Sequence, residues 1–273
     1  MNELNVLCQK KRIILKRIVI KVGSAVLTEK NKIAKERMLN LVNLIAKLRK
    51  KYDVVLVTSG AVAAGYSALK MDKTKQIGKK AIAAAGQPIL MTSYKKKFDI
   101  FEIDTAQILL TEDDFDSRKR TKMLQEILDA HLNNDILPIV NENDITSTPE
   151  QLFGDNDQLS ANVAHAANAD LLVILSDIDG YYDKNPKEFP DAKIYKTMNE
   201  LPEGVLDEES TPNNAFATGG IVTKLKAADF MMKHGRKMFL TNGFDLTAAE
   251  SFLLHDTQIS GTLFEAKPNK EEK

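Results

Sequence analysis

The sequence predicts an α/β fold in which helices cover both faces of a mainly parallel sheet. Short apolar runs, rich in β-branched residues, alternate along the chain with segments of helical periodicity. Most of these runs are continuously apolar rather than alternating, as expected of strands that are buried on both faces. Strands separated by helices favour parallel pairing. With 273 residues, 43% of them hydrophobic, the chain is long enough for one substantial core or for two small domains.

Six strands and five helices are predicted. The first helix has the clearest pattern, because Met38, Leu41, Ile45 and Leu48 recur at three- and four-residue spacing and form one apolar face. Ligands of such sheets bind at the carboxyl ends of the strands, so the residues that follow each strand are the candidates for function. The predicted strands cover residues 18–22, 54–57, 106–110, 136–140, 171–175 and 238–240, and the remaining helices cover 79–97, 118–132, 158–167 and 223–234.

Charge and composition exclude several classes of function. Lys plus Arg and Asp plus Glu number 38 each, so no net field favours nucleic acid or an anionic membrane. The single cysteine, Cys8, rules out an intrachain disulfide and a cysteine metal cluster, and the four histidines lack metal-ligand spacing. No apolar run approaches the roughly 20 residues of a membrane span, and residues 10–17 lack the apolar core of a signal peptide. We therefore expect a cytoplasmic protein without nucleic-acid or membrane partners.

The first predicted strand contains a lysine, Lys21, near its end. A lysine inside an apolar strand is costly unless its ammonium group reaches a partner or solvent. Gly23 follows two residues later and would let a phosphate approach the backbone closely. Lys21 is thus a candidate anion ligand. The alternative is a lysine that extends along the sheet edge into solvent.

A small-residue turn follows the second predicted strand. Gly60 and Gly65 have the glycine spacing of a Walker A loop, but Tyr66 and Ser67 stand where that motif requires Lys and then Ser or Thr. The segment is therefore not a P-loop. A strand, a turn and a helix start remain, and such a turn presents free backbone N–H groups to an anion. An ordinary strand-to-helix turn is the alternative.

Two polar clusters follow the fourth predicted strand. Residues 141–144 are Asn-Glu-Asn-Asp, and residues 154–157 are Gly-Asp-Asn-Asp. Asp155, Asn156 or Asp157 can cap the helix expected near residue 158, because Asp and Asn are favoured at that position. Capping does not account for the other polar residues, which suit an amino group, a hydroxylated ligand or a hydrated Mg²⁺.

Two later segments are candidates for nucleotide binding. The fifth predicted strand leads into Ser176 and Asp177, followed by the tyrosine pair 181–182, which suits either an adenine ring or a packed loop. Residues 218–224, Thr-Gly-Gly-Ile-Val-Thr-Lys, open a helix. Paired glycines, a helix N-terminus and Lys224 together form an anion site. A flexible loop with a threonine N-cap is the alternative.

In this order the motifs resemble those of the amino acid kinase family. The pair of clusters after the fourth strand indicates the members that phosphorylate the side-chain carboxylate of glutamate. The resemblance implies a three-layer αβα sandwich that binds glutamate and ATP at the carboxyl ends of its strands and makes an acyl phosphate for proline biosynthesis. The matching segments, in register over roughly residues 16–264, are 20–24 (Ile-Lys-Val-Gly-Ser), 57–61 (Val-Thr-Ser-Gly-Ala), 85–87 (Ala-Gly-Gln), 141–144, 154–157 and 218–224.

The resemblance also implies a role for each matching residue. Lys21 and Lys224 would stabilise the transferring phosphoryl group, with Asp157 organising the two lysines. Gly60 would donate a backbone hydrogen bond in the catalytic centre. Mg²⁺ would be held mainly through the ATP phosphates, with Asp155 or Asp157 as candidate direct ligands. Glutamate would be held by Ser59, Asp144 and Asn156, and ATP by Lys21, Ser176 (often Thr in the family), Asp177, Thr218, Gly219, Gly220, Ile221, Val222, Thr223 and Lys224.

The family pattern also suggests domain limits and partners. It places the kinase domain at residues 16–264, between an amino-terminal extension of residues 1–15 and a charged tail of residues 265–273. Longer members append an RNA-associated PUA domain, which we expect this chain to lack. The expected partners are L-glutamate, proline as a feedback ligand, glutamate-5-phosphate reductase as the downstream enzyme, and further copies of the chain in a homo-oligomer. The alternatives are a family member acting on another carboxylate, a carbamate or a nucleoside phosphate, and a non-catalytic sensor of amino acids or nucleotides.

Overall fold

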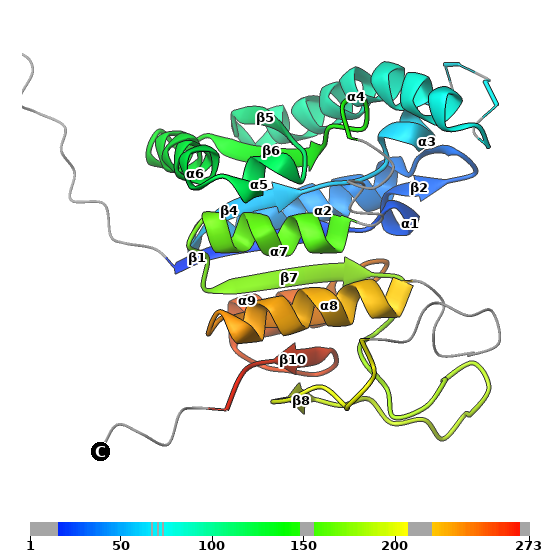
Figure 1. Ribbon diagram of the computed structural model, residues 1–273, viewed down its shortest axis with the longest axis vertical. Helices are drawn as coiled ribbons and strands as arrows, with labels where there is room; N and C mark the ends of the chain where they lie inside the picture. The colour runs from blue at the N-terminus through cyan, green and yellow to red at the C-terminus, as the bar shows by residue number, and fades with distance from the viewer. Residues whose placement is uncertain are drawn as a thin grey trace, which may run out of the picture.

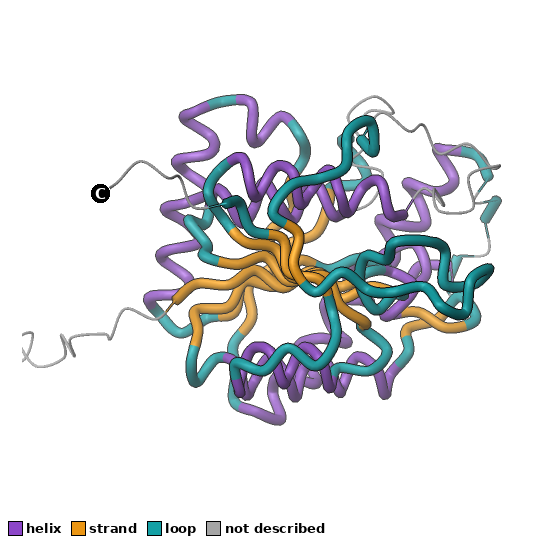
Figure 2. The backbone as a smooth tube through the Cα atoms, turned by 90° about the horizontal axis from the view of Figure 1, so that it is seen from below, coloured by secondary structure: helices purple, strands orange, loops and turns teal. Residues whose placement is uncertain are grey.

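The computed structural model describes residues 16–66, 68–69, 71–72, 74–147, 156–206 and 220–267. In this part of the chain eight strands form a single sheet in the order β5-β6-β4-β1-β7-β9-β10-β8. Helices lie against both faces of the sheet (Figure 1), and the strands form one twisted layer between them (Figure 2). The predicted α/β class and its αβα layers are confirmed. The predicted extension 1–15 and residues 268–273 of the predicted tail lie outside the described residues.

The middle of the sheet is parallel. All six predicted strands are observed, with ends within two residues of those predicted, and each pairs in parallel with its neighbours among them. Their carboxyl ends therefore lie along one edge of the sheet. These strands are β1 (Lys16–Val22), β4 (Tyr52–Val57), β5 (Thr105–Leu110), β6 (Leu137–Glu142), β7 (Leu171–Ser176) and β9 (Lys237–Asn242).

Four further strands have no counterpart among the predictions. β10 (Thr262–Phe264) pairs antiparallel with β9, and β8 (Thr197–Met198) joins β10 at the edge of the sheet. β2 (Thr28–Glu29) and β3 (Lys32–Ile33) form a separate two-stranded hairpin. All four have only two or three residues, so they contain too little pattern for a strand to be predicted.

The predicted helices are observed with ends within three residues of those expected. The sequence pattern does not predict α1 (Ser24–Leu27), α5 (Asp113–Asp116) or α9 (Thr247–His255), which are short, and η1 (Asp99–Phe101) extends the end of α4. α3 (Ala61–Tyr66) is the helix expected to start after the glycine turn. The helices predicted from periodicity are α2 (Lys35–Leu48), α4 (Gln76–Phe98), α6 (Arg118–Asn133), α7 (Asn156–Ala166) and α8 (Gly220–Lys233).

The alternation of side chains along β1 places Lys21 on one particular face of the sheet. Ile18, Ile20 and Val22 belong to the core shared with α2, α4 and α9, whereas Val19 belongs to the core shared with α6, α7 and α8. Side chains two residues apart on a strand point to the same face. Lys21 therefore shares the face of Val19, where α7 and α8 lie beside each other across the sheet (Figure 1).

Candidate active site

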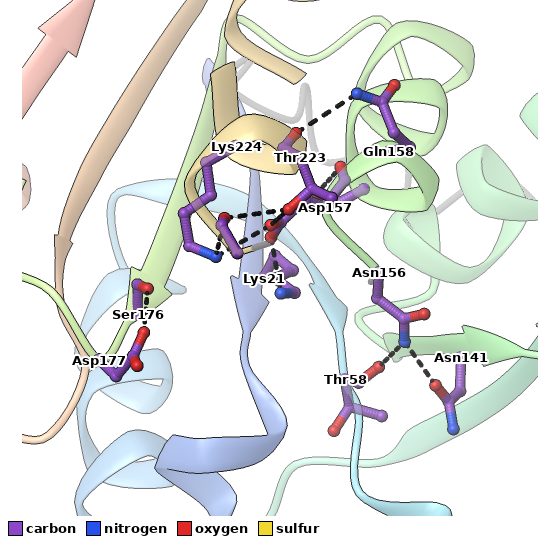
Figure 3. A network of polar contacts seen from close by, with 12 residues as sticks. Lys21, Thr58, Asn141, Asn156, Asp157, Gln158, Ser176, Asp177, Thr223 and Lys224 are labelled. Atoms are coloured by element: carbon purple, nitrogen blue, oxygen red, sulfur yellow. Dashed lines mark hydrogen bonds and ion pairs between the residues drawn. The ribbon is translucent and has the colours of Figure 1, made fainter. Parts of the chain in front are cut away.

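Two lysines and one aspartate form a buried cluster at the carboxyl edge of the sheet. Lys21 Nζ lies 2.6 Å from Asp157 Oδ1, and Lys224 Nζ donates to Asp157 Oδ2 at 3.1 Å (Figure 3). Lys21 is 1% exposed, Asp157 0% and Lys224 5%. The alternative of a solvent-seeking lysine is therefore wrong for Lys21, because its ammonium group ends on a buried carboxylate.

Two ammonium groups face one carboxylate in this cluster, so these three described side chains together carry one positive charge. Burial raises the pKa of the Asp157 carboxyl, but the charges and hydrogen bonds of Lys21 and Lys224 outweigh this effect, so the pKa lies below its ordinary value. The ionised form of Asp157 is thus favoured, with one of its oxygens facing each lysine. Excess positive charge in a buried site favours a further anion, such as a phosphoryl group.

The start of α8 contributes more contacts to this cluster. Lys224 Nζ donates to the backbone oxygen of Gly220 at 2.9 Å, which folds the side chain back over the first turn of its own helix. Thr223 Oγ1 lies 3.0 Å from both Asp157 Oδ2 and Gly220 O, so its single hydrogen can serve only one of them at a time. Of the predicted nucleotide segment, residues 220–224 thus begin α8 beside the cluster, whereas Thr218 and Gly219 lie outside the described residues.

Capping does not explain Asn156 and Asp157. Both residues lie in the first turn of α7, and neither directs its side chain to an N–H group of that helix. Asn156 Nδ2 donates to Thr58 O at 2.6 Å and to Asn141 Oδ1 at 2.8 Å (Figure 3). The third capping candidate, Asp155, falls outside the described residues, so its role stays a prediction.

The turn after β4 depends on glycine. Gly60 has a φ of +101°, a backbone conformation that other residues rarely adopt, and α3 begins directly after it. A Cβ atom on Gly65 would lie 1.9 Å from Ile82 O, and one on Gly86 would lie 1.8 Å from Ala61 O. The glycines of this turn and of the 85–87 motif therefore let α3 and α4 pack at very close range.

A cavity of about 440 Å³ opens between these segments. It is lined by the predicted substrate residues Ser59, Asp144 and Asn156, together with Gly60. The sequence pattern contains no signal for Lys79, which belongs to an exposed stretch near the start of α4 and reaches the cavity only in the fold. The described lining residues are Ser24, Thr28, Asn31, Ser59, Gly60, Ala61, Val62, Ala63, Tyr66, Lys79, Asn141, Glu142, Asp144 and Asn156.

Asp144 lies in the wall of this cavity, where burial and nearby lysines shift the pKa of its carboxyl in opposite directions. Burial raises the pKa of its carboxyl above the ordinary value, although the positive charges of Lys79 and Lys80 act in the opposite direction. Lys80 Nζ also donates to the backbone oxygens of Ile145 at 3.1 Å and Ser147 at 2.6 Å, which ties α4 to the loop containing Asp144. A cation bound next to Asp144 would relieve the cost of ionising it.

The lysine cluster separates the cavity from the end of β7. β1 lies between β4 and β7 in the sheet, so Asn156 and the pair Ser176–Asp177 flank the cluster on opposite sides (Figure 3). Ser176 is buried and donates to Asp177 Oδ1 at 3.0 Å. Tyr181 is also buried and stacks on Tyr195 with ring centroids 5.7 Å apart, so at this residue the packed-loop alternative holds.

A parallel αβα sheet with a buried lysine–aspartate–lysine cluster at its carboxyl edge is the arrangement expected of a phosphotransferase with an acidic acceptor. The chain belongs to the amino acid kinase family, whose family model matches residues 16–242. It is 55% identical over 255 residues to glutamate 5-kinase of Wolinella succinogenes, an alignment that covers 92% of this chain and 98% of the relative. It is 50% identical over 250 residues to glutamate 5-kinase of Leishmania donovani, covering 92% of this chain and 95% of the relative. The resemblance predicted from the six motifs is confirmed.

Solved structures support the same fold. UMP kinase of Ureaplasma parvum matches with a TM-score of 0.61 at 17% identity, over 93% of this chain and 100% of that chain. At this level of identity the match concerns the fold alone. Within the described part of the chain, no helix is both long and apolar enough to cross a membrane.

Proposed function

We propose that the protein transfers the γ-phosphoryl group of ATP to the side-chain carboxylate of L-glutamate, forming L-glutamate 5-phosphate in the first step of proline biosynthesis. The observation that supports this most directly is the position of the cavity beside the lysine cluster. Asn156 lines the cavity and Asp157, the next residue of α7, holds both lysines. A substrate in the cavity is therefore held next to excess positive charge.

The charges of the cavity match an amino acid with two carboxylates. Lys79 is the one lysine or arginine among the described lining residues, and it suits the α-carboxylate of glutamate. Asp144 and Glu142 line the same cavity and suit the α-ammonium group. With these ends held, the side-chain carboxylate is directed to Lys21 and Lys224.

The reaction requires alignment and positive charge more than proton transfer. A glutamate side chain, with an ordinary pKa of about 4.3, is already ionised at neutral pH, so no general base is needed. Two anionic groups must approach each other, and the charge on the phosphoryl oxygens persists through the transfer. Lys21 and Lys224 offset that charge in a buried site, where such stabilisation is strong.

The other face of the cluster suits the nucleotide. Ser176, Asp177 and residues 220–224 lie there, and the start of α8 adds backbone N–H groups to the lysine charges. Mg²⁺ would add positive charge to the ATP phosphates. Among the described residues no group of three His, Cys, Asp or Glu side chains could hold a metal ion, and both oxygens of Asp157 already face lysines. We therefore place Mg²⁺ on the phosphates rather than on Asp157.

The product suggests further partners. An acyl phosphate hydrolyses readily in water, so we propose prompt reduction by glutamate-5-phosphate reductase in the cytoplasm, with proline as a feedback ligand and a homo-oligomeric enzyme. We propose no role for nucleic acid, because acidic and basic residues balance at 38 each. Tight binding to tRNA at physiological salt would contradict this last point.

The assay is ADP release with ATP and Mg²⁺, combined with trapping of the acyl phosphate by hydroxylamine. Glutamate, aspartate and N-acetylglutamate serve as acceptors, and a reaction without acceptor measures background hydrolysis. We expect hydroxamate formation with glutamate. ADP release that rises only with another acceptor would show a different family activity, and ligand binding without any ADP release would indicate a sensor.

A further inference from the structure

Three side-chain amides from three separate elements form a continuous chain, of which Asn156 and Asn141 line the cavity and Gln87 does not. Asn156 at the start of α7 donates from Nδ2 to Asn141 Oδ1, on β6, at 2.8 Å. Asn141 Nδ2 in turn donates to Gln87 Oε1, on α4, at 2.8 Å. Asn156 Nδ2 also donates to Thr58 O at 2.6 Å, at the end of β4. Figure 3 shows the Asn156 end of this chain. The amides therefore connect α7, β6 and α4 around the substrate cavity.

The backbone carbonyl of Thr58 determines the orientation of all three amides. The oxygen and nitrogen of an amide are hard to distinguish by shape, but a carbonyl oxygen can only accept a hydrogen bond. Asn156 must therefore turn its NH₂ group toward Thr58, and the second hydrogen of that group meets Asn141. Asn141 must then accept through Oδ1 and present its NH₂ group to Gln87. Gln87 must consequently accept through Oε1.

At the far end of the chain, the orientation of the Gln87 amide is set by Asn141 even though it leaves another Gln87 atom without a described partner. Gln87 Nε2 is buried and has no hydrogen-bond partner among the residues that the structure describes. A buried donor without a partner is unfavourable. Turning the Gln87 amide over would set its NH₂ group against the NH₂ group of Asn141, which is worse. The orientation of Gln87 is thus dictated by Asn141, and Asn141 is held in turn from both sides.

The near end of the chain determines what Asn156 offers to a ligand. Both hydrogens of its amide are engaged with Thr58 and Asn141, so Oδ1 is the amide atom left for the cavity. Asp144 adds a carboxylate to the same lining. Asn156 Oδ1 and the Asp144 carboxylate are both hydrogen-bond acceptors, which suit a donor such as an ammonium group.

We propose that Gln87 is a positioning residue: it acts through Asn141 to hold Asn156 Oδ1 available to the cavity, and thereby selects substrates with an α-ammonium group. Gln87 is not among the described residues that line the cavity, so its effect on the ligand is indirect. The inference rests on the proposed function, because it assigns the ammonium group of glutamate to this acceptor wall.

The test compares glutamate with glutarate, which is glutamate without its amino group. Calorimetry measures the Kd of each ligand without ATP, so phosphoryl transfer is not required. Gln87→Leu removes the acceptor for Asn141, whereas Gln87→Glu keeps an acceptor oxygen at the same position. In Gln87→Leu we expect glutamate binding to weaken about five- to tenfold, the loss of one hydrogen-bond contribution, and glutarate binding to stay within about twofold. Gln87→Glu restores the preference for glutamate.

Kinetic measurements supply a second readout. Gln87→Leu raises KM for glutamate, while kcat and KM for ATP stay within about twofold of wild type. An equal loss of glutamate and glutarate binding, or no rescue by Gln87→Glu, would overturn the proposal and leave Gln87 a packing residue. Should Gln87→Leu fail to fold, Gln87→Met gives the same comparison with an unbranched side chain. A wild-type protein that binds glutamate but releases no ADP overturns the proposed function without affecting this test.

Discussion

Replacing Lys21 with methionine tests the catalytic cluster directly. The change keeps a long, flexible side chain on β1 but removes one of two positive charges, so the net charge of the cluster falls from one positive charge to zero. Lys21 is 1% exposed, so water cannot take over its role at the phosphoryl oxygens. A charge positioned in this way is commonly worth roughly 3–4 kcal/mol at the transition state, which corresponds to a kcat lower by about 10²–10³-fold.

We expect Lys21→Met to lower the free energy of unfolding by less than the usual cost of breaking a buried ion pair. Removing one partner of a buried ion pair typically costs about 3–5 kcal/mol, because the other charge stays buried and unpaired. Asp157 keeps Lys224 at 3.1 Å, so Lys21→Met costs less than this. The measurements are kcat from ADP release at saturating glutamate and ATP, and the midpoint of thermal unfolding.

A matched control is Lys47→Met, at an exposed lysine that pairs with Glu250 at 2.6 Å. Exposed pairs contribute about 0–1 kcal/mol, so this variant keeps both wild-type kcat and wild-type stability. Lys224→Met is expected to behave like Lys21→Met. A folded Lys21→Met protein with kcat within tenfold of wild type would refute the reasoning, because Lys21 would then serve the fold and not the reaction.

Four other expectations concern the cavity and its neighbours. Asp144→Asn raises KM for glutamate and leaves KM for ATP unchanged. Because burial raises the pKa of Asp144, the wild-type affinity for glutamate is lost as pH falls through that raised pKa. The variant does not show this loss of affinity at low pH. Because the folded state favours the protonated form of Asp144, this carboxyl contributes to the free energy of unfolding at low pH, and that contribution is lost as pH rises through the raised pKa. Asp144→Asn, which resembles the protonated form, therefore does not lower the unfolding midpoint at pH 7. A clear drop in this midpoint would contradict the expectation. Asn156→Ala raises KM for glutamate with a loss of about 1.5–3 kcal/mol, and an effect on KM for ATP alone would move Asn156 to the nucleotide side. Gly65→Ala destabilises the α3–α4 contact by about 1–3 kcal/mol, because the new Cβ would lie 1.9 Å from Ile82 O; an unchanged unfolding midpoint would show that the helices can separate freely. Proline inhibition, measured in the same assay, is relieved by raising glutamate and weakens in Asp144→Asn; inhibition that persists at saturating glutamate would require a separate site.

The elements of the central sheet follow from local sequence. Six apolar runs become six parallel strands, because a strand covered on both faces needs apolar residues at every position. Polar residues placed directly after such strands must lie along one edge of the sheet. This is why Lys21 and Ser176, at strand ends, and Asp144, just after one, were candidates for function before any distance was known, whereas Ser59 was added by the family resemblance. The short strands β8 and β10 could not be predicted, because their pairing depends on neighbours far along the chain.

The partners of the site residues follow from contacts between distant segments. Lys21 alone is compatible with a solvent-exposed end, and only the approach of α7 supplies the buried carboxylate of Asp157. Asn156 alone is compatible with a helix cap, whereas the position of the Thr58 carbonyl turns its amide toward β4. Lys79 has no distinguishing pattern and joins the cavity because α4 packs beside α3. The sequence pattern predicts which residues are buried and which residues end a strand. The energy of a charge or an amide, however, depends on the few atoms within about 4 Å of it, and those atoms come from elsewhere in the chain.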